Sequence, residues 1–257
     1  MLLIRSVATA RGWRWIADGY ALFRKSPLMW AFITLGLLCV FKLILLIPFI
    51  GVAAILAMPI ILVGLMEGCR ALDLGGELKP AYLLSGFVRN TAALVVLGGM
   101  YLAGNLLIVL LIATLGGEAL TQVLKFYAEQ KVTAENIHHI RDAISKATLA
   151  VLVGWTLSLP LTMACWFSPL LVYLHDMKPL QAMHASLSAC WRNMMPFLIY
   201  GGVFFVALIL VTPLSMATRI LDLGMWLLAP LVIPSIYASY KDIFPATETP
   251  PPGDAKG

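Results

Sequence analysis

One lysine inside an apolar stretch is the first residue that could do chemistry in this sequence. Lys42 lies in the stretch from Leu28 to Ile47, which is long enough to cross a bilayer. A lysine near the bilayer centre costs roughly 2.5 to 3.5 kcal/mol on insertion scales and tends to be kept for a function. Because Lys42 is close to the outer end of its stretch, its stem can carry the ammonium to the interface. We expect an interfacial lysine, with a substrate or ion contact as the alternative.

A second set of candidates combines hydroxyl side chains with prolines in the apolar stretch 147–174. Its members are Thr156, Ser158, Thr162 and Ser168, together with Pro160 and Pro169. Proline removes a backbone hydrogen bond, and many transporters build a midplane site from broken helices with a polar lining. Proline is also common in spanning helices that have no transport role. Lys42, Thr156, Ser158 and Thr162 are therefore the candidate transport contacts, and a kinked structural helix is the alternative.

The remaining titratable residues do not form a catalytic or metal-binding pattern. His138 and His139 are adjacent, so on a helix their rings point about 100° apart and chelate poorly. His175, Asp176 and His184 lack the further Cys, Glu or His that zinc or hydrolytic chemistry needs. The sequence also lacks the motifs of zinc proteases, serine hydrolases and phosphate-binding loops. We expect no enzyme, no cofactor and no metal.

Composition places these residues in a membrane protein. The chain has 257 residues, of which 61% are hydrophobic and 12% are charged, too few charges to coat a soluble globule. Dividing the apolar stretches at charges and turn signals gives spans at 28–47, 49–66, 91–115, 147–174, 197–216 and 221–240. We expect an all-α polytopic bundle of about six transmembrane helices over 28–244. A proline-rich, polar tail over 245–257 should be disordered.

The positive charges favour both termini in the cytoplasm. In that orientation twelve of the 18 Lys and Arg residues lie in cytoplasmic segments, and four of the outer ones lie in one insert over 116–146. The basic residues do not gather in one patch, so we expect no nucleic-acid partner. The four cysteines are isolated from one another, which favours reduced thiols.

The N-terminal segment 1–27 has the pattern of a cytoplasmic amphipathic helix. Trp13, Ile16, Tyr20 and Phe23 recur at helical spacing, whereas the charged residues Arg11, Arg14, Asp18 and Lys25 fall on another sector. We expect Trp13, Tyr20 and Phe23 to anchor the helix at the membrane interface, and Arg11, Arg14 and Lys25 to attract anionic lipid. Packing of the same helix onto the protein's own loops needs the same pattern and is the alternative.

Similar short motifs precede spans 1, 3 and 5. They are Leu22-Phe23-Arg24-Lys25, Phe87-Val88-Arg89-Asn90 and Cys190-Trp191-Arg192-Asn193. We expect three units, each an interfacial amphipathic helix followed by a transmembrane hairpin, and chance similarity is the alternative. The insert over 116–146 makes the second unit longer. Its periodicity predicts two short amphipathic helices outside the membrane, the second with Thr133 as N-cap.

Small residues recur along span 2. Ala53, Ala57, Gly64 and Gly68 follow a spacing that lets helix backbones approach closely. We expect span 2 to be a packing helix at the centre of the bundle. Its partner is either another part of this chain or a second protomer.

The most specific patterns lie at the two ends of the chain. They are Gly12-Trp13-Arg14-Trp15-Ile16, Gly19-Tyr20-Ala21-Leu22-Phe23-Arg24-Lys25-Ser26-Pro27 and Tyr237-Ala238-Ser239-Tyr240-Lys241-Asp242-Ile243-Phe244. These patterns resemble an uncharacterised family of six-span bacterial inner-membrane proteins, and the resemblance extends from Arg11 to Phe244. The layout is distantly similar to the membrane domain attached to some glycerophosphodiester phosphodiesterases, whose catalytic domain is absent here. The resemblance implies a bacterial cytoplasmic membrane and supplies no functional residues.

These observations favour a non-catalytic function. We expect an accessory or scaffold protein that packs with membrane lipids, other membrane proteins or a second copy of itself. The alternative is a small-solute or lipid transporter that uses the kinked polar span 4.

Overall fold

The computed structural model describes residues 3–45, 50–129, 137–218 and 223–245. Every regular element within these ranges is helical, which confirms the predicted all-α class. The elements are α1 (Arg11–Lys25), α2 (Pro27–Leu45), α3 (Ile50–Asp73), the 3-10 helix η1 (Pro80–Leu84), α4 (Ser85–Val88), α5 (Thr91–Glu129), α6 (Ile137–Trp166), α7 (Ser168–His175), α8 (Pro179–Arg192), α9 (Met194–Thr218) and α10 (Leu223–Ile243).

Five stretches within the described residues are long and apolar enough to cross a membrane. They are Pro27–Ile44, Gly51–Asp73, Thr91–Phe126, His138–His175 and Met194–Pro213, which correspond to the first five predicted spans. The sixth predicted span corresponds to α10, a helix of 21 residues that contains Pro230 and Pro234 and is not one of the five. A membrane bundle of several apolar helices is therefore shown, and the count of six stays a prediction.

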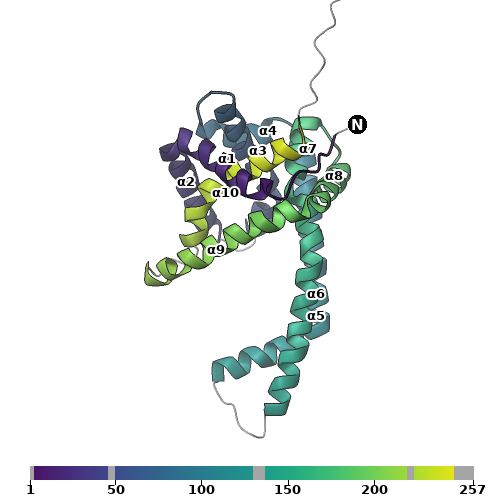
Figure 1. The fold of residues 1–257 in the computed structure, drawn as a ribbon. Coiled ribbons are helices and arrows are strands. Elements are labelled where there is room, and N and C mark those ends of the chain that lie inside the picture. The colour runs from purple at the N-terminus through teal and green to yellow at the C-terminus, as the bar shows by residue number, and fades with distance from the viewer. Residues whose placement is uncertain (1–2, 46–49, 130–136, 219–222, 246–257) are drawn as a thin grey trace, which may run out of the picture.

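The insert 116–146 differs from the prediction of two separate short helices. Its described parts are continuations of α5 and α6, which form one long hairpin projecting from the rest of the molecule (Figure 1). At about 1.5 Å per residue, the 39 residues of α5 measure roughly 58 Å along the helix axis, about twice the thickness of a bilayer's hydrocarbon core. Thr133, the expected N-cap, lies outside the described residues.

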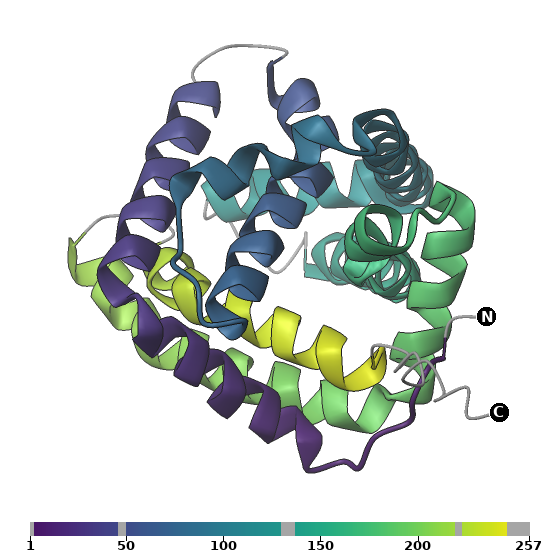
Figure 2. The same cartoon turned by 90° about the horizontal axis from the view of Figure 1, so that it is seen from above.

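The three predicted units close into a ring. The short helices η1 and α4 pack on α3 of the first unit, α8 packs on α6 and α7 of the second, and α1 packs on α9 and α10 of the third. Viewed from above, α1 and α8 lie at the edge of the bundle, and η1 and α4 cross over α3 (Figure 2). Each unit therefore begins by covering the hairpin of the preceding unit, and the first unit covers the last.

Small residues let these helices approach closely. A Cβ added to Gly86 on α4 would lie 2.7 Å from the carbonyl oxygen of Ile60, and one added to Gly19 on α1 would lie 2.6 Å from the backbone nitrogen of Ser235. On α8 the corresponding small residues are Ala182 and Ala189, both fully buried. These contacts exclude a larger side chain at both glycines unless a backbone moves.

The core lies at the end of the molecule where the ring closes. The side chains of Trp15, Trp30 and Phe167 are completely buried there. Aromatic contacts connect α1 to α9, with the Trp15 and Phe197 ring centroids 5.1 Å apart. Phe167 occupies the break between α6 and α7, and Pro169 follows within the first turn of α7. The predicted interruption of span 4 is thus a break between two helices.

Candidate functional site

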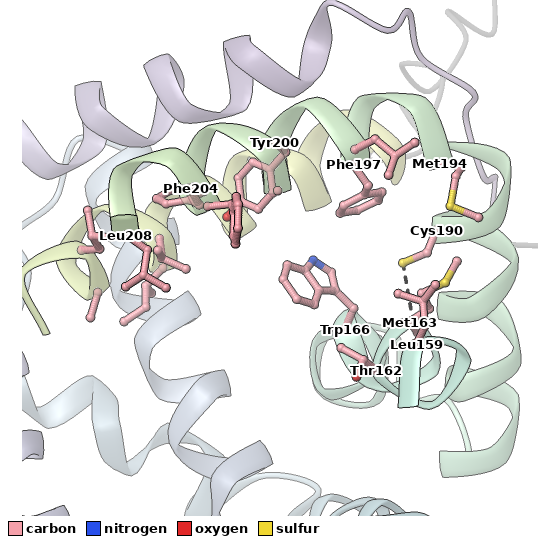
Figure 3. Close-up of a pocket in the computed structure, with 17 residues that line it drawn as sticks. Leu159, Thr162, Met163, Trp166, Cys190, Met194, Phe197, Tyr200, Phe204 and Leu208 are labelled. Carbon is pink, nitrogen blue, oxygen red and sulfur yellow. Dashed lines mark hydrogen bonds between the residues drawn. The ribbon is translucent and has the colours of Figure 1, made fainter. Parts of the chain in front are cut away.

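An apolar groove runs between α6, α8, α9 and α10 (Figure 3). Its volume is about 550 Å³, and apolar side chains such as Leu159, Phe197, Phe204, Leu208 and Val232 line it. Both α6 and α9 contribute these residues from stretches that can cross a membrane. A groove of this composition suits a hydrocarbon ligand and offers few polar contacts to a solute.

The polar groups around the groove are mostly engaged by the protein itself. The Tyr200 hydroxyl lies 2.8 Å from Ser235 Oγ. Cys190 Sγ lies 3.6 Å from the Met163 carbonyl oxygen, and burial raises the pKa of the Cys190 thiol to about 12. Because a protonated thiol is a poor nucleophile, this cysteine is chemically inert at neutral pH. Trp166 Nε1 is buried and has no acceptor among the described residues.

A charged groove of about 430 Å³ lies where the two ends of the chain meet, between α1, α3 and α10. Arg11 Nε lies 2.6 Å from Asp242 Oδ2, which also accepts the indole N–H of Trp15 at 2.9 Å. Lys241 forms an ion pair with Asp73 at the end of α3. The residue patterns that carry the family resemblance thus contact each other directly, and these ion pairs join the first unit to the third.

The predicted anchoring residues divide into two groups. Trp13 and Tyr20 are 57% and 50% exposed, and Arg14 is also exposed, so all three are available to a membrane surface. Phe23 is half-buried against the core.

The other two predicted anchoring residues contact the protein itself. Arg11 binds Asp242, and Lys25 Nζ donates to the Leu72 carbonyl oxygen at 2.7 Å. One face of helix α1 therefore packs on the protein and another stays exposed, and the contact of the exposed face with a membrane stays a prediction.

The face of α1 that packs inward was not identified in the sequence analysis. It consists of Gly12, Trp15, Ile16, Gly19 and Leu22. The sequence does carry the signal, because these residues recur at steps of three and four. Ile16, expected beside Trp13 and Tyr20, belongs to this buried face.

The predicted packing residues of span 2 also divide. A Cβ on Gly64 would lie 2.6 Å from the Leu83 Cα, and one on Gly68 would lie 2.6 Å from Leu78 Cδ1, whereas Ala57 is half-buried and Ala53 exposed. The partner is thus the segment around η1 of the same chain. Of the five candidate spans, the one in α3 is the most buried, at 44%, in agreement with a central packing helix.

The candidate transport contacts do not share one site. Thr156 and Ser158 donate their hydroxyls to Leu152 and Gly154, one turn back on their own helix, both at 2.8 Å. Thr162 lines the apolar groove, and Lys42 is an exposed residue near the end of α2. Among the described residues no group of three or more His, Cys, Asp or Glu side chains could hold a metal ion.

The last residue of each short motif donates a hydrogen bond to a backbone carbonyl far away in the sequence. Lys25 donates to the Leu72 carbonyl at the end of α3, and Asn90 Nδ2 donates to the Val172 carbonyl near the end of α7 at 2.8 Å. Asn193 Nδ2 donates to the Arg5 carbonyl at 3.0 Å. The backbone N–H of Arg5 in turn binds the Ile243 carbonyl at the end of α10. Two of the acceptors lie in the last turns of α3 and α7, whereas the third lies before α1, so the three-unit repeat stays a prediction.

The long apolar helices and their shared hydrocarbon-lined groove define a polytopic helical membrane protein. Over 94% of its length the chain is 31% identical to a probable inner membrane protein of Burkholderia thailandensis, of which it covers 94%. The chain belongs to the family of that protein, which agrees with the expected resemblance to inner-membrane proteins. The six spans, the terminal motifs and the distant likeness to glycerophosphodiester phosphodiesterase membrane domains stay predictions. A scan of known protein families finds no match, and no solved structure matches.

Proposed function

We propose that this protein is a non-catalytic scaffold of the inner membrane that organises lipid and packs with membrane partners. The observation that supports this proposal is the ring of short helices, because each carries large exposed apolar side chains. They are Trp13 and Tyr20 on α1, Phe87 and Val88 on α4, and Leu180 and Trp191 on α8. Side chains of this kind insert at the boundary between headgroups and acyl chains.

Basic residues accompany the exposed apolar side chains of the ring. Arg14, Arg24, Arg89 and Arg192 are all exposed. A basic residue near an anionic membrane surface is worth on the order of 1 kcal/mol. The ring thus combines insertion into the monolayer with attraction to anionic headgroups.

The proposed orientation puts the ring and both termini in the cytoplasm. It rests on the excess of Lys and Arg in the segments that carry the ring. The part of the α5 and α6 hairpin that is longer than the hydrocarbon core then extends beyond the outer face of the membrane. Transport through span 4 is the weaker candidate, since the Thr156 and Ser158 hydroxyls are already bonded within α6.

Lipid analysis of the purified protein tests the scaffold proposal. After extraction in a mild detergent, we expect anionic phospholipids to be enriched over the bulk membrane and membrane proteins to be cross-linked to the chain. Replacing Arg14, Arg24 and Arg192 by Gln should reduce the lipid enrichment severalfold. The matched control is Arg141→Gln, because Arg141 is an exposed arginine on α6, in the projecting hairpin and away from the ring. A monomer that purifies alone without lipid preference would contradict the proposal.

A further inference from the structure

The apolar groove between α6 and α9 lies in the part of the molecule that is proposed to cross the membrane. Its lining residues include Leu159 and Trp166 from α6, Phe197 and Phe204 from α9, and Leu228 from α10. In Figure 3 the ring of Trp166 faces the side chains of α9 across this space. Hydrocarbon surrounds spanning helices, so the molecules that can enter this groove from the membrane are apolar, unlike the solutes of a water-filled pocket.

The lining of the groove sets the class of occupant. Apolar side chains such as Leu159, Phe197 and Leu208 line its volume of about 550 Å³. The helices α6 and α9 contribute these side chains from stretches that can cross a membrane, where acyl chains surround the protein. A flexible acyl chain can occupy such a groove without burying a polar group.

The unpaired indole N–H of Trp166 favours a lipid over a protein segment. A buried donor without an acceptor costs about 1–3 kcal/mol. Trp166 Nε1 is such a donor at the wall of the groove. A lipid carries free ester carbonyl oxygens, whereas the backbone carbonyls of a partner helix are already bonded within that helix. Because Trp166 itself lines the groove, turning the indole toward it would offer the N–H to a lipid ester.

We infer that the groove is a binding site for one acyl chain of a membrane phospholipid, with Trp166 donating to the ester group. This inference rests on the membrane placement in the proposed function, but not on the ring or its charges. The enrichment of anionic phospholipids tests the proposed function, and the photolabelling of the groove tests this inference. Either result can be negative while the other is positive.

Two adjacent glycines of α9 give a matched pair of variants. Gly201 lines the groove, and a Cβ built on it meets nothing within 4 Å. Gly202 is equally open but does not line the groove. Leucine has a higher helix propensity than glycine, so neither change should unfold α9. Gly201→Leu places a branched side chain in the groove, whereas Gly202→Leu adds the same side chain elsewhere on the helix.

The test uses vesicles that contain a phosphatidylcholine with a photoactivatable diazirine near the end of one acyl chain. After illumination, we expect labelled peptides from α6 and α9 that contain Trp166, Phe197 or Phe204. Labelling of these peptides should fall severalfold in Gly201→Leu and stay at the wild-type level in Gly202→Leu. Equal labelling in the two variants would overturn the inference, and so would a partner protein cross-linked at these residues in native membranes.

A second variant tests the role of the indole N–H. Trp166→Phe keeps an aromatic ring but removes the donor. It should lower labelling by the ester lipid about 2–10-fold, the range expected for one hydrogen bond. Labelling by a diazirine alkane without an ester should not change. An equal loss for both probes would show that Trp166 only shapes the groove, and would overturn the assignment of the ester contact.

Discussion

Asn193 closes the ring of helices with both ends of its buried amide. Its Oδ1 accepts the N–H of Val7 at 2.8 Å, and its Nδ2 donates to the carbonyl oxygens of Arg5 and Ala189. Leucine has a similar size but would leave the Val7 N–H and the Arg5 carbonyl without this partner.

We therefore expect Asn193→Leu to lower the free energy of unfolding by about 1–3 kcal/mol, the cost of an unsatisfied buried group. Thermal unfolding in detergent measures this loss, and faster trypsin cleavage after Arg5 would locate it. The control is Asn105→Leu, because Asn105 Nδ2 bonds only within its own helix, to the Tyr101 carbonyl. Equal losses for the two variants would contradict the role of Asn193.

The ionised carboxyl of Asp176 should make the stability of the folded protein depend on pH. Hydrogen bonds from Asn90 and then from Arg89 hold the pKa of its carboxyl below its usual value. A carboxyl with a lowered pKa stabilises the folded state at neutral pH, and the contribution is lost as the pH falls through the lowered pKa. We expect the unfolding temperature to fall between neutral pH and about pH 3, and to fall less in Asp176→Asn. The control Glu77→Gln, at an exposed residue, should retain the wild-type pH profile.

Single residues of α1 show what periodicity can and cannot predict. The pattern correctly gave an amphipathic helix with exposed Trp13 and Tyr20. It did not distinguish these from Trp15 and Ile16, which are buried. The physical reason is that lipid and the protein interior are both apolar, so aromatic residues occur on both faces of an interfacial helix.

At the scale of elements, the packing of α1 on α10 depends on Gly19. An added Cβ would lie 2.6 Å from the Ser235 backbone nitrogen, which cannot move as a flexible side chain can. We expect Gly19→Leu to destabilise the protein by about 1–3 kcal/mol despite its better helix propensity. Ala17→Leu is the matched control, because Ala17 is exposed on the same helix. If thermal unfolding shows no difference between the variants, α1 does not pack as described.

The insert shows why element boundaries were harder to predict than elements. Gly116 and Gly117 looked like the end of a span, yet α5 continues through both. A Cβ on Gly116 would lie 2.6 Å from the Ala150 Cβ, so this glycine serves the close approach of α6 to α5. The sequence alone does not distinguish a glycine that allows close helix packing from a glycine that ends a helix.

At the scale of the whole molecule, the proposed orientation predicts a labelling pattern. In a background without native cysteines, a cysteine at position 130 should react with an impermeant maleimide in intact cells, and one at position 80 should not. Position 80 should react after the cells are opened, which controls for its accessibility. The reverse pattern would invert the orientation and place the ring outside.

The closure of the ring was the part of the architecture that the sequence did not reveal. The short motifs containing Lys25, Asn90 and Asn193 predicted three units, and short helices do pack on the hairpins of neighbouring units. Which hairpin each short helix covers depends on contacts between residues far apart in sequence, such as Arg11 and Asp242. Local periodicity carries no information about such pairs.

Ring closure also imposes an order on biosynthesis. Helix α1 leaves the ribosome first, but its partners α9 and α10 begin at Met194 and Leu223. At 5–20 residues per second, roughly ten to forty seconds pass before the first partner has been synthesised. During that interval the contacts of Trp15 with Phe197 and Asp242 cannot form. Until then this part of the inward face of α1 is open to the lipid monolayer or to a membrane chaperone.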